Sequence, residues 1–280
     1  MTLEEIKAII KEKVVGQWVP EHTDTRHYYR HVPSGTLVSS VTTKNIVDKA
    51  HLPPWAAKMA IEWMDQSGRW EKYQEAKKNL TANEYLQGAI LAHTAIRDDA
   101  GGVGLAVHDI ASNFIIQWSQ TGTKPADITT FIPEGSKSDG RVWAGVRSVQ
   151  KLFDDRPNVV PLASELLVGS LALNAAGTLD LLVLNNNELE VWDFKVANSI
   201  DTFGYSLQIA AYSSMFTSMT KLRPKAWRVV KISKDYDKVD IYRLVGYPKA
   251  VQCFRALSKV FDLKEAQEFT LEKDVRKIVL

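Results

Sequence analysis

Two aspartates and a lysine have the residue types and spacing that support hydrolytic chemistry. Asp180 falls at the start of one apolar run, and Asp193 and Lys195 fall near the end of the next. Residues two apart on a strand share a face, so the Asp193 carboxylate and the Lys195 amine point the same way. A hairpin through Asn185–Asn187 would bring Asp180 beside Asp193. The sequence therefore predicts two carboxylates and an amine in one pocket.

A divalent cation is the natural occupant of such a pocket. Two carboxylates at close range repel each other, and a cation between them removes that repulsion. Hard oxygen ligands on a rigid sheet suit Mg²⁺ or Mn²⁺, which polarises a phosphodiester and acidifies bound water. The spacing alone has an ordinary alternative, in which Asp180 is a turn acid after Gly177 while Asp193 and Lys195 form a surface ion pair.

Four further residues strengthen the metal hypothesis. Glu165 falls one predicted strand earlier and adds a third carboxylate, and His108 lies on an earlier helix. Gln208 and Tyr212 are four apart on the following helix and share a face. Each has a structural alternative: a solvated strand acid, a partly buried imidazole and two side chains at the edge of the core.

The elements that must position these residues combine helices and strands. Thr2 and Glu5 have capping-box spacing at the start of an amphipathic helix. The hydrophobic periodicity predicts helices at 2–13, 43–49, 53–64, 71–98, 105–118, 141–155, 202–216 and 249–263. It predicts strands at 28–32, 37–41, 161–174, 177–185, 188–196, 226–233 and 238–245.

Two breaks separate the predicted helices. Gly101 and Gly102 are expected to interrupt the chain, and the polar residues 119–141 are expected to form a loop. The whole pattern predicts an α/β fold in which a central mixed β-sheet is flanked by helices, with a helical N-terminal part.

The order of these residues resembles the PD-(D/E)XK nuclease superfamily, and more closely its RecB-type branch. The matching motifs, in chain order, are GLAVH ending at His108, Glu165, GTLD ending at Asp180, WDFK ending at Lys195, and QIAAY from Gln208 to Tyr212. The stretch from His27 to Ala60 is similar to phage-encoded exonucleases, and the mitochondrial genome-maintenance exonuclease has a similar arrangement. The likeness spans roughly residues 27–245.

The resemblance implies a restriction-endonuclease-like core and a role for each residue. It implies a single nuclease domain over 1–280, with a mainly helical part at 1–100 and the core at 101–265. Asp180, Asp193, the backbone carbonyl of Phe194, His108 and Glu165 would hold Mg²⁺ or Mn²⁺. Lys195 would be the catalytic lysine, and Gln208 and Tyr212 would orient it or a phosphate. Val196 departs from the Thr or Ser that many members place after the lysine.

The implied activity is Mg²⁺-dependent hydrolysis of DNA, as an exonuclease acting on ends or on single strands. Two alternatives stay open: a structure-selective endonuclease or resolvase of the same superfamily, and a non-catalytic DNA-binding protein on a nuclease fold. Replication or recombination proteins are implied as partners, and nothing in the sequence specifies an oligomeric state. Basic and aromatic residues near the N-terminus are candidate contacts to single-stranded DNA: Lys44, Lys49, Lys58, Trp55 and Tyr28.

Composition limits the remaining classes. The 280 residues include 35 Lys or Arg and 33 Asp or Glu, so the formal net charge of +2 favours a local DNA site over a broadly basic surface. The single cysteine, Cys253, excludes an internal disulfide and a four-thiolate iron–sulfur cluster. No secretory signal or spanning helix is expected. The expectation is therefore a cytoplasmic protein, without membrane contact, of a bacterial or phage-infected host cell.

Overall fold

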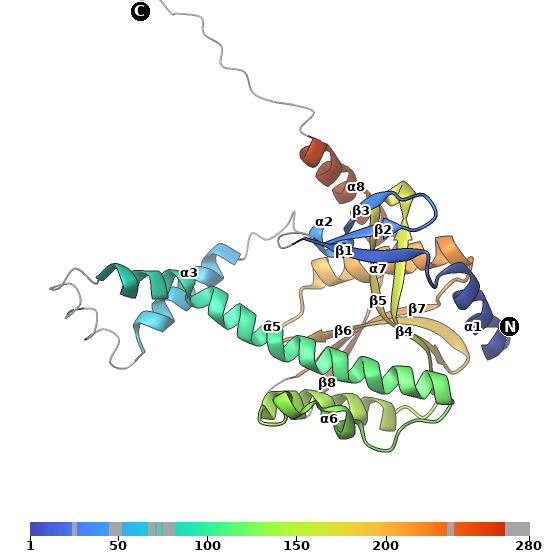
Figure 1. Cartoon of the computed structure of the whole chain (residues 1–280), viewed down its shortest axis with the longest axis horizontal. Helices are drawn as coiled ribbons and strands as arrows, with labels where there is room; N and C mark the ends of the chain where they lie inside the picture. Colours follow the sequence, from blue (N-terminus) through green and yellow to red (C-terminus); the bar gives the residue numbers. More distant parts are fainter. Residues whose placement is uncertain are drawn as a thin grey trace, which may run out of the picture.

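A mixed β-sheet with helices on both faces organises the chain (Figure 1). The computed structural model describes residues 1–23, 27–44, 52–66, 71, 74, 82–233 and 238–266. Eight strands of these residues form the sheet. They are β1 Trp18–His22, β2 His27–His31, β3 Leu37–Ser40, β4 Val159–Ser170, β5 Ala175–Asn185, β6 Glu188–Val196, β7 Ala226–Ile232 and β8 Val239–Arg243. The predicted α/β class, with its mixed sheet, is confirmed.

The sheet divides along one edge of β5. On one side β5 pairs antiparallel with β4 over its whole length. On the other side β3 pairs with Ala175 and Ala176, whereas β6 pairs with residues 181–185. Between these two ladders lies a fork, where no described strand pairs with residues 177–180 on the edge of β5 opposite β4. From β6 the sheet continues through the parallel strand β7 to β8.

Two helices cover one face of the central strands. They are α5 Ala82–Thr121 and α6 Gly140–Asp154. Apolar side chains of α5, such as Phe114, pack with α6 and with Trp192 and Phe194 of β6. Trp192 and Phe194 therefore face α5, and Asp193 and Lys195, which alternate with them, face the other way.

Three helices cover the opposite face. They are α1 Leu3–Lys13, α7 Thr202–Thr220 and α8 Tyr247–Ala266. Leu179 of β5 and Val191 of β6 pack with Tyr212 of α7 and Phe254 of α8 in this core. The predicted capping box of α1 is confirmed, because Thr2 and Glu5 exchange backbone-to-side-chain hydrogen bonds of 2.7 and 3.2 Å.

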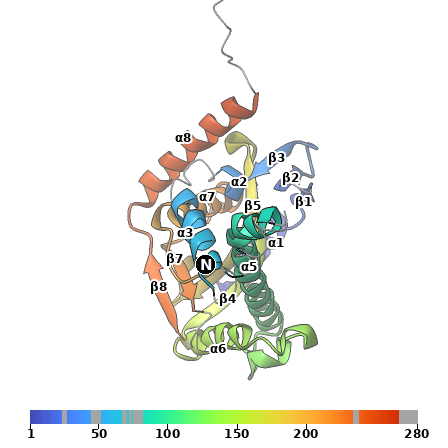
Figure 2. The ribbon, with the colours of Figure 1, turned by 90° about the vertical axis from the view of Figure 1, so that its left-hand side faces the viewer.

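The break expected at Gly101 and Gly102 is wrong, because the helix α5 continues through both residues. The helix runs without interruption over 40 residues, about 60 Å at ~1.5 Å per residue. Glycine costs a helix only ~1 kcal/mol relative to alanine, and the buried stripe through Val107 and Phe114 outweighs that cost. Its N-terminal part projects beyond the sheet with α3 Leu52–Met64 against it (Figure 1; nearly end-on in Figure 2).

Several other boundaries differ from the predictions. The strand β1 was not predicted, and the predicted loop 119–141 contains the end of α5 and two short 3₁₀ helices, Ile128–Phe131 and Glu134–Ser136. The helix α2 Val41–Lys44 begins two residues before the predicted helix at 43–49, whose last five residues lie outside the described part of the chain. Of the predicted helix 71–98, residues 72, 73 and 75–81 also lie outside it.

Candidate metal centre

Three acidic residues form a row across β4, β5 and β6. Ser164 pairs with Leu181 and Leu166 with Leu179, so the register of β4 and β5 puts Glu165 opposite Asp180. The ladder between β5 and β6 ends one residue before Asp180 and Asp193 would face each other. Directly opposed residues on neighbouring antiparallel strands lie on one face about 5 Å apart. The three carboxylates therefore converge at the fork.

The fork gives Asp180 its position. Its Oδ2 accepts a hydrogen bond of 2.8 Å from the backbone N–H of Phe194, where the strands β5 and β6 have separated. A buried carboxylate thus occupies the place of a strand-to-strand hydrogen bond. Asp180 lies in the middle of β5 and is 7% exposed, so its description as a turn acid at a strand start is wrong. It is thus the backbone N–H of Phe194 that contacts this carboxylate. The predicted role of the Phe194 carbonyl as a metal ligand stays a prediction.

The helix α5 brings His108 over the fork. Its Nε2 lies 3.2 Å from Asp180 Oδ2, and its Nδ1 lies 3.4 Å from Glu165 Oε1. One ligand atom from each of these three residues lies within 4.8 Å of the other two. This separation is suitable for a shared cation, since ligand oxygens and nitrogens about 2–2.2 Å from one ion are close neighbours.

Glu165 is held by an unusual backbone. Its φ is +51°, in the left-handed region, although it lies inside the strand β4. This conformation costs a non-glycine residue roughly 1–2 kcal/mol and occurs often at functional sites. Glu165 Oε1 is buried and has no hydrogen-bond partner in the structure as described. The strain and the buried oxygen, which has the His108 imidazole at 3.4 Å but no hydrogen bond, both fit a residue that binds a ligand.

We expect Glu165→Gly to be more stable than Glu165→Ala by about 1 kcal/mol, because glycine relieves the left-handed strain and both changes remove the carboxylate. Urea unfolding of the two variants measures the difference. Glu188 is the matched control, since it lies in β6 without a positive φ. At position 188 we expect the alanine variant to be more stable than the glycine variant. If the alanine variant were the more stable one at position 165 as well, the strain at Glu165 would be contradicted.

The pair of Asp193 and Lys195 is buried. Lys195 Nζ lies 2.6 Å from Asp193 Oδ2, and the two side chains are 17% and 1% exposed. A surface ion pair is therefore the wrong description. Despite that distance, neither Asp193 oxygen has a partner of good hydrogen-bond geometry among the described residues. Two unsatisfied buried oxygens, added to that of Glu165, fit oxygen ligation of a divalent cation.

Burial and proximity shift the titration of these groups. Burial raises the pKa of Asp193 to about 7 and of Glu165 to about 7, with the Asp180 charge adding to both. Burial opposes ionisation of Asp180, but Lys195 and His108 hold its pKa below the ordinary value. Burial alone would lower the pKa of His108, yet the hydrogen bond and charge of Asp180 raise it to about 9. The Lys195 pKa is raised too, because Asp193 and Asp180 outweigh burial.

We expect Mn²⁺ affinity to rise with pH. Metal binding needs deprotonated ligands, so it must displace protons from His108, with a pKa of about 9, and from Glu165, with a pKa of about 7. The dissociation constant should fall about tenfold per pH unit between ~7.5 and ~8.5, where only the imidazole titrates, and more steeply below. Calorimetric titration measures this, and the His108→Gln variant should lose the dependence above pH ~7.5. A constant affinity across this range would contradict the site.

The face of α7 toward the sheet carries Gln208 and Tyr212. Gln208 Nε2 donates to the Tyr212 hydroxyl over 3.3 Å. Tyr212 is buried against Gly177, where an added Cβ would lie 2.6 Å from its ring. Burial, together with the charges of Asp193 and Asp180, raises the pKa of Tyr212 well above its ordinary value, so the phenol stays protonated beside the acids. Glycine at 177 is what lets this ring approach the fork.

Two tyrosines near the site were not predicted to belong to it. The Lys195 amine lies 5.3 Å from the centre of the Tyr205 ring, on the first turn of α7. Tyr29 of β2 is hydrogen-bonded to the Thr178 side chain, and the charge of Glu165 contributes to the raised pKa of its phenol. Tyr205 falls one residue after Gly204 and seven before Tyr212, and helical spacing alone would have placed both tyrosines on one face of α7. For Tyr29 the sequence holds no such signal, because its approach depends on how β3 joins β5.

The predicted DNA contacts fare differently. Lys44 is fully buried, and its amine lies 2.6 Å from Asp262 Oδ1 and 2.9 Å from Ser258 Oγ. It therefore links α2 to α8 inside the protein, and its prediction as a DNA contact is wrong. Lys58 is exposed and lies 3.4 Å from Glu62, and Trp55 is half-buried with an edge-to-face contact to His93. Tyr28 is half-buried in β2. Lys49 lies outside the described residues.

Comparisons with known proteins assign the chain to no family. No protein-family model matches the chain, and no curated protein matches it. Solved structures do match, among them one described as the crystal structure of SSO0001, with a TM-score of 0.27 and 12% identity over 55% of this chain and 74% of that chain. Within the described residues, no helix has both the length and the apolar character needed to span a membrane.

Proposed function

We propose that the protein is a Mg²⁺- or Mn²⁺-dependent DNA nuclease of the PD-(D/E)XK type. The observation that supports this best is the row of Glu165, Asp180 and Asp193 at the fork, with the Lys195 amine beside it. The order of these residues in the sequence, with His108 before them, is similar to the RecB-type pattern. Three carboxylate oxygens of this row, one of Glu165 and two of Asp193, are buried without a hydrogen bond, and that is costly unless a ligand compensates them.

His108, Glu165 and Asp180 would hold the metal ion, with Asp193 at its edge. Carboxylate oxygens favour Mg²⁺ and Mn²⁺, and the imidazole shifts the preference toward Mn²⁺. When bound, such an ion polarises a phosphoryl oxygen and lowers the pKa of water. The Phe194 amide keeps Asp180 oriented, and the left-handed backbone of Glu165 keeps the third acid in the row.

Lys195 would supply positive charge to the reacting phosphate. Asp193 holds its amine at 2.6 Å, and the cation lies over the Tyr205 ring. A preorganised ammonium stabilises negative charge that develops on a phosphoryl oxygen. Gln208 and the protonated Tyr212 would support the acids from the α7 side, where the Gln208 amide donates to the Tyr212 hydroxyl and leaves the phenol hydrogen to be donated.

A pocket of about 390 Å³ opens beside His108 and Lys195 and would accommodate the DNA strand. Its lining is Ala100, Gly101, Gly104, Leu105, His108, Phe194, Lys195 and Val196. Gly101 has no atom of another side chain within 4 Å of its would-be Cβ, so this part of α5 presents bare backbone next to the site. A sugar or a base can approach a helix closely at such a position.

Two single-stranded DNA substrates test the proposal, each incubated with Mg²⁺. One is linear and end-labelled, and the other is a closed circle. Progressive loss of label from the linear strand with an intact circle supports an exonuclease, as the resemblance favours. Cutting of the circle supports a structure-selective endonuclease instead. If neither is cut with Mg²⁺ or Mn²⁺, the enzyme proposal fails, and calorimetric titration with Mn²⁺ then shows whether a metal-binding protein remains.

A further inference from the structure

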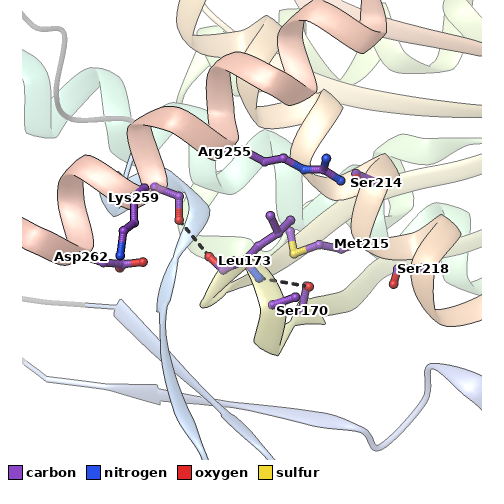
Figure 3. Close-up of a pocket in the computed structure, with 10 residues that line it drawn as sticks. Ser170, Leu173, Ser214, Met215, Ser218, Arg255, Lys259 and Asp262 are labelled. Atoms are coloured by element: carbon purple, nitrogen blue, oxygen red, sulfur yellow. Dashed lines mark hydrogen bonds between the residues drawn. The ribbon is translucent and has the colours of Figure 1, made fainter.

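A second pocket lies on the other side of α7 from the acids. Residues two apart on a helix point in nearly opposite directions, so α7 turns Tyr212 toward the sheet and Ser214 toward α8. The pocket lies between α7, α8 and the 3₁₀ turn Leu171–Leu173, and its volume is about 390 Å³ (Figure 3). Its lining includes hydroxyl and basic side chains, among them Ser170, Ser214, Ser218, Arg255 and Lys259.

Two cations of α8 line this pocket without a counter-charge. Arg255 and Lys259 are four apart, so they share one face of the helix and border the same space (Figure 3). Neither makes an ion pair or a hydrogen bond with the residues that the structure describes. The one acid of the lining, Asp262, is already paired with the buried Lys44 at 2.6 Å. The pocket therefore keeps two uncompensated positive charges.

Hydroxyl groups complete the lining. The backbone N–H of Leu173 donates to Ser170 Oγ over 3.3 Å, which leaves the Ser170 hydroxyl hydrogen available to donate. Ser258 Oγ donates to Leu173 O over 2.8 Å and accepts from Lys44, so it fixes the floor between α8 and the 3₁₀ turn. Ser214 and Ser218 are four apart on α7 and line the wall opposite. Leu173 adds apolar surface between these polar groups, whereas Met215 is fully buried.

We propose that this pocket binds a nucleotide phosphate. Guanidinium, ammonium and hydroxyl donors around one space suit the tetrahedral oxygens of a phosphate, and charge-assisted bonds to them are the strong kind. The volume exceeds that of a phosphate alone and leaves room for a sugar against Leu173. The choice of a nucleotide rests on the proposed DNA function. The phosphate belongs either to a DNA strand or to a free mononucleotide.

Binding in EDTA tests this without any cleavage. The probes are thymidine 5′-monophosphate, a short oligothymidylate and, as the phosphate-free control, thymidine. The test variant is Arg255→Gln with Lys259→Gln. The matched control is Lys249→Gln with Lys264→Gln, which removes the same charge from α8 outside the pocket lining. Thermal melting confirms that both variants fold.

We expect the test variant to bind at least one phosphate probe about tenfold more weakly or worse, and the control variant to bind like the unmodified protein. A loss for the oligonucleotide alone assigns the phosphate to a strand, and a loss that includes the monophosphate assigns a nucleotide. Equal effects of the two variants, pocket-dependent binding of thymidine, or no binding of either phosphate probe would overturn the proposal. The acids at the fork take no part in this binding assay. A failed nuclease assay therefore does not affect its interpretation, and a failed binding assay does not affect the interpretation of the nuclease assay.

Discussion

Replacing Asp180 with asparagine is expected to reduce DNA cleavage ~10³-fold or more. The amide keeps the shape of the side chain and can still accept from the Phe194 N–H, but it loses the charge that both His108 and Lys195 approach. Losing a metal ligand removes several kcal/mol of transition-state stabilisation, and each ~1.4 kcal/mol is tenfold in rate. Initial rates on the end-labelled strand, at saturating Mg²⁺, give the ratio.

Asp155→Asn is the matched control for Asp180→Asn. Asp155 is 52% exposed at the end of α6 and pairs with Lys151, so the same chemical change there should leave the rate within about twofold. The melting temperature in the absence of metal separates lost chemistry from lost folding. A D180N protein that is folded and cleaves within tenfold of the unmodified rate would remove Asp180 from the proposed centre.

Lys195→Ala is expected to lower cleavage ~10²–10³-fold while Mn²⁺ still binds. The change removes the cation that contacts Asp193 but none of the three ligand atoms grouped around His108. Losing one preorganised electrostatic donor typically has an effect of this size. Single-turnover cleavage rates and calorimetric Mn²⁺ titration, taken on the same preparation, separate charge stabilisation from metal binding.

Lys231→Ala provides the comparison. Lys231 lies opposite Lys195 in the register of β6 and β7. Its amine, however, pairs with Asp240 at 3.0 Å, and Asp240 does not belong to the acidic row. The loss of Lys231 should change the cleavage rate by less than about threefold. Equal losses in both variants would mean that general positive charge on this sheet, and not the position of Lys195, assists the reaction. Normal activity of K195A would reject its proposed role.

Local patterns predicted most of the elements around the site. The apolar runs at 177–185 and 188–196 and the asparagine turn between them predicted the β5–β6 hairpin, and hence the meeting of Asp180 and Asp193. What they could not predict is that the two strands separate just before the acids face each other. That separation depends on β3, which is more than 100 residues earlier in the chain and pairs with the start of β5.

The errors have a common physical origin in long-range packing. Lys44 looked like a surface cation because charge usually marks exposure, but Asp262 and Ser258 on the last helix compensate its burial. Gly101 and Gly102 looked like a break because their helix propensity is low, whereas the buried half of α5 holds the helix through them. The left-handed backbone of Glu165 follows from neither propensity nor pattern, since only the assembled strands impose it.

Chain order has a consequence for how the acidic row comes together. Glu165, Asp180 and Asp193 emerge within one stretch from β4 to β6, and His108 emerges earlier, on α5. Synthesis proceeds from the N-terminus, so the His108 imidazole already exists when the strands close, and the approach of Asp180 then raises its pKa to about 9 and makes it cationic at neutral pH. The folded protein thus carries its own temporary counter-ion beside the acids, and a metal ion can replace that charge after the sheet has formed.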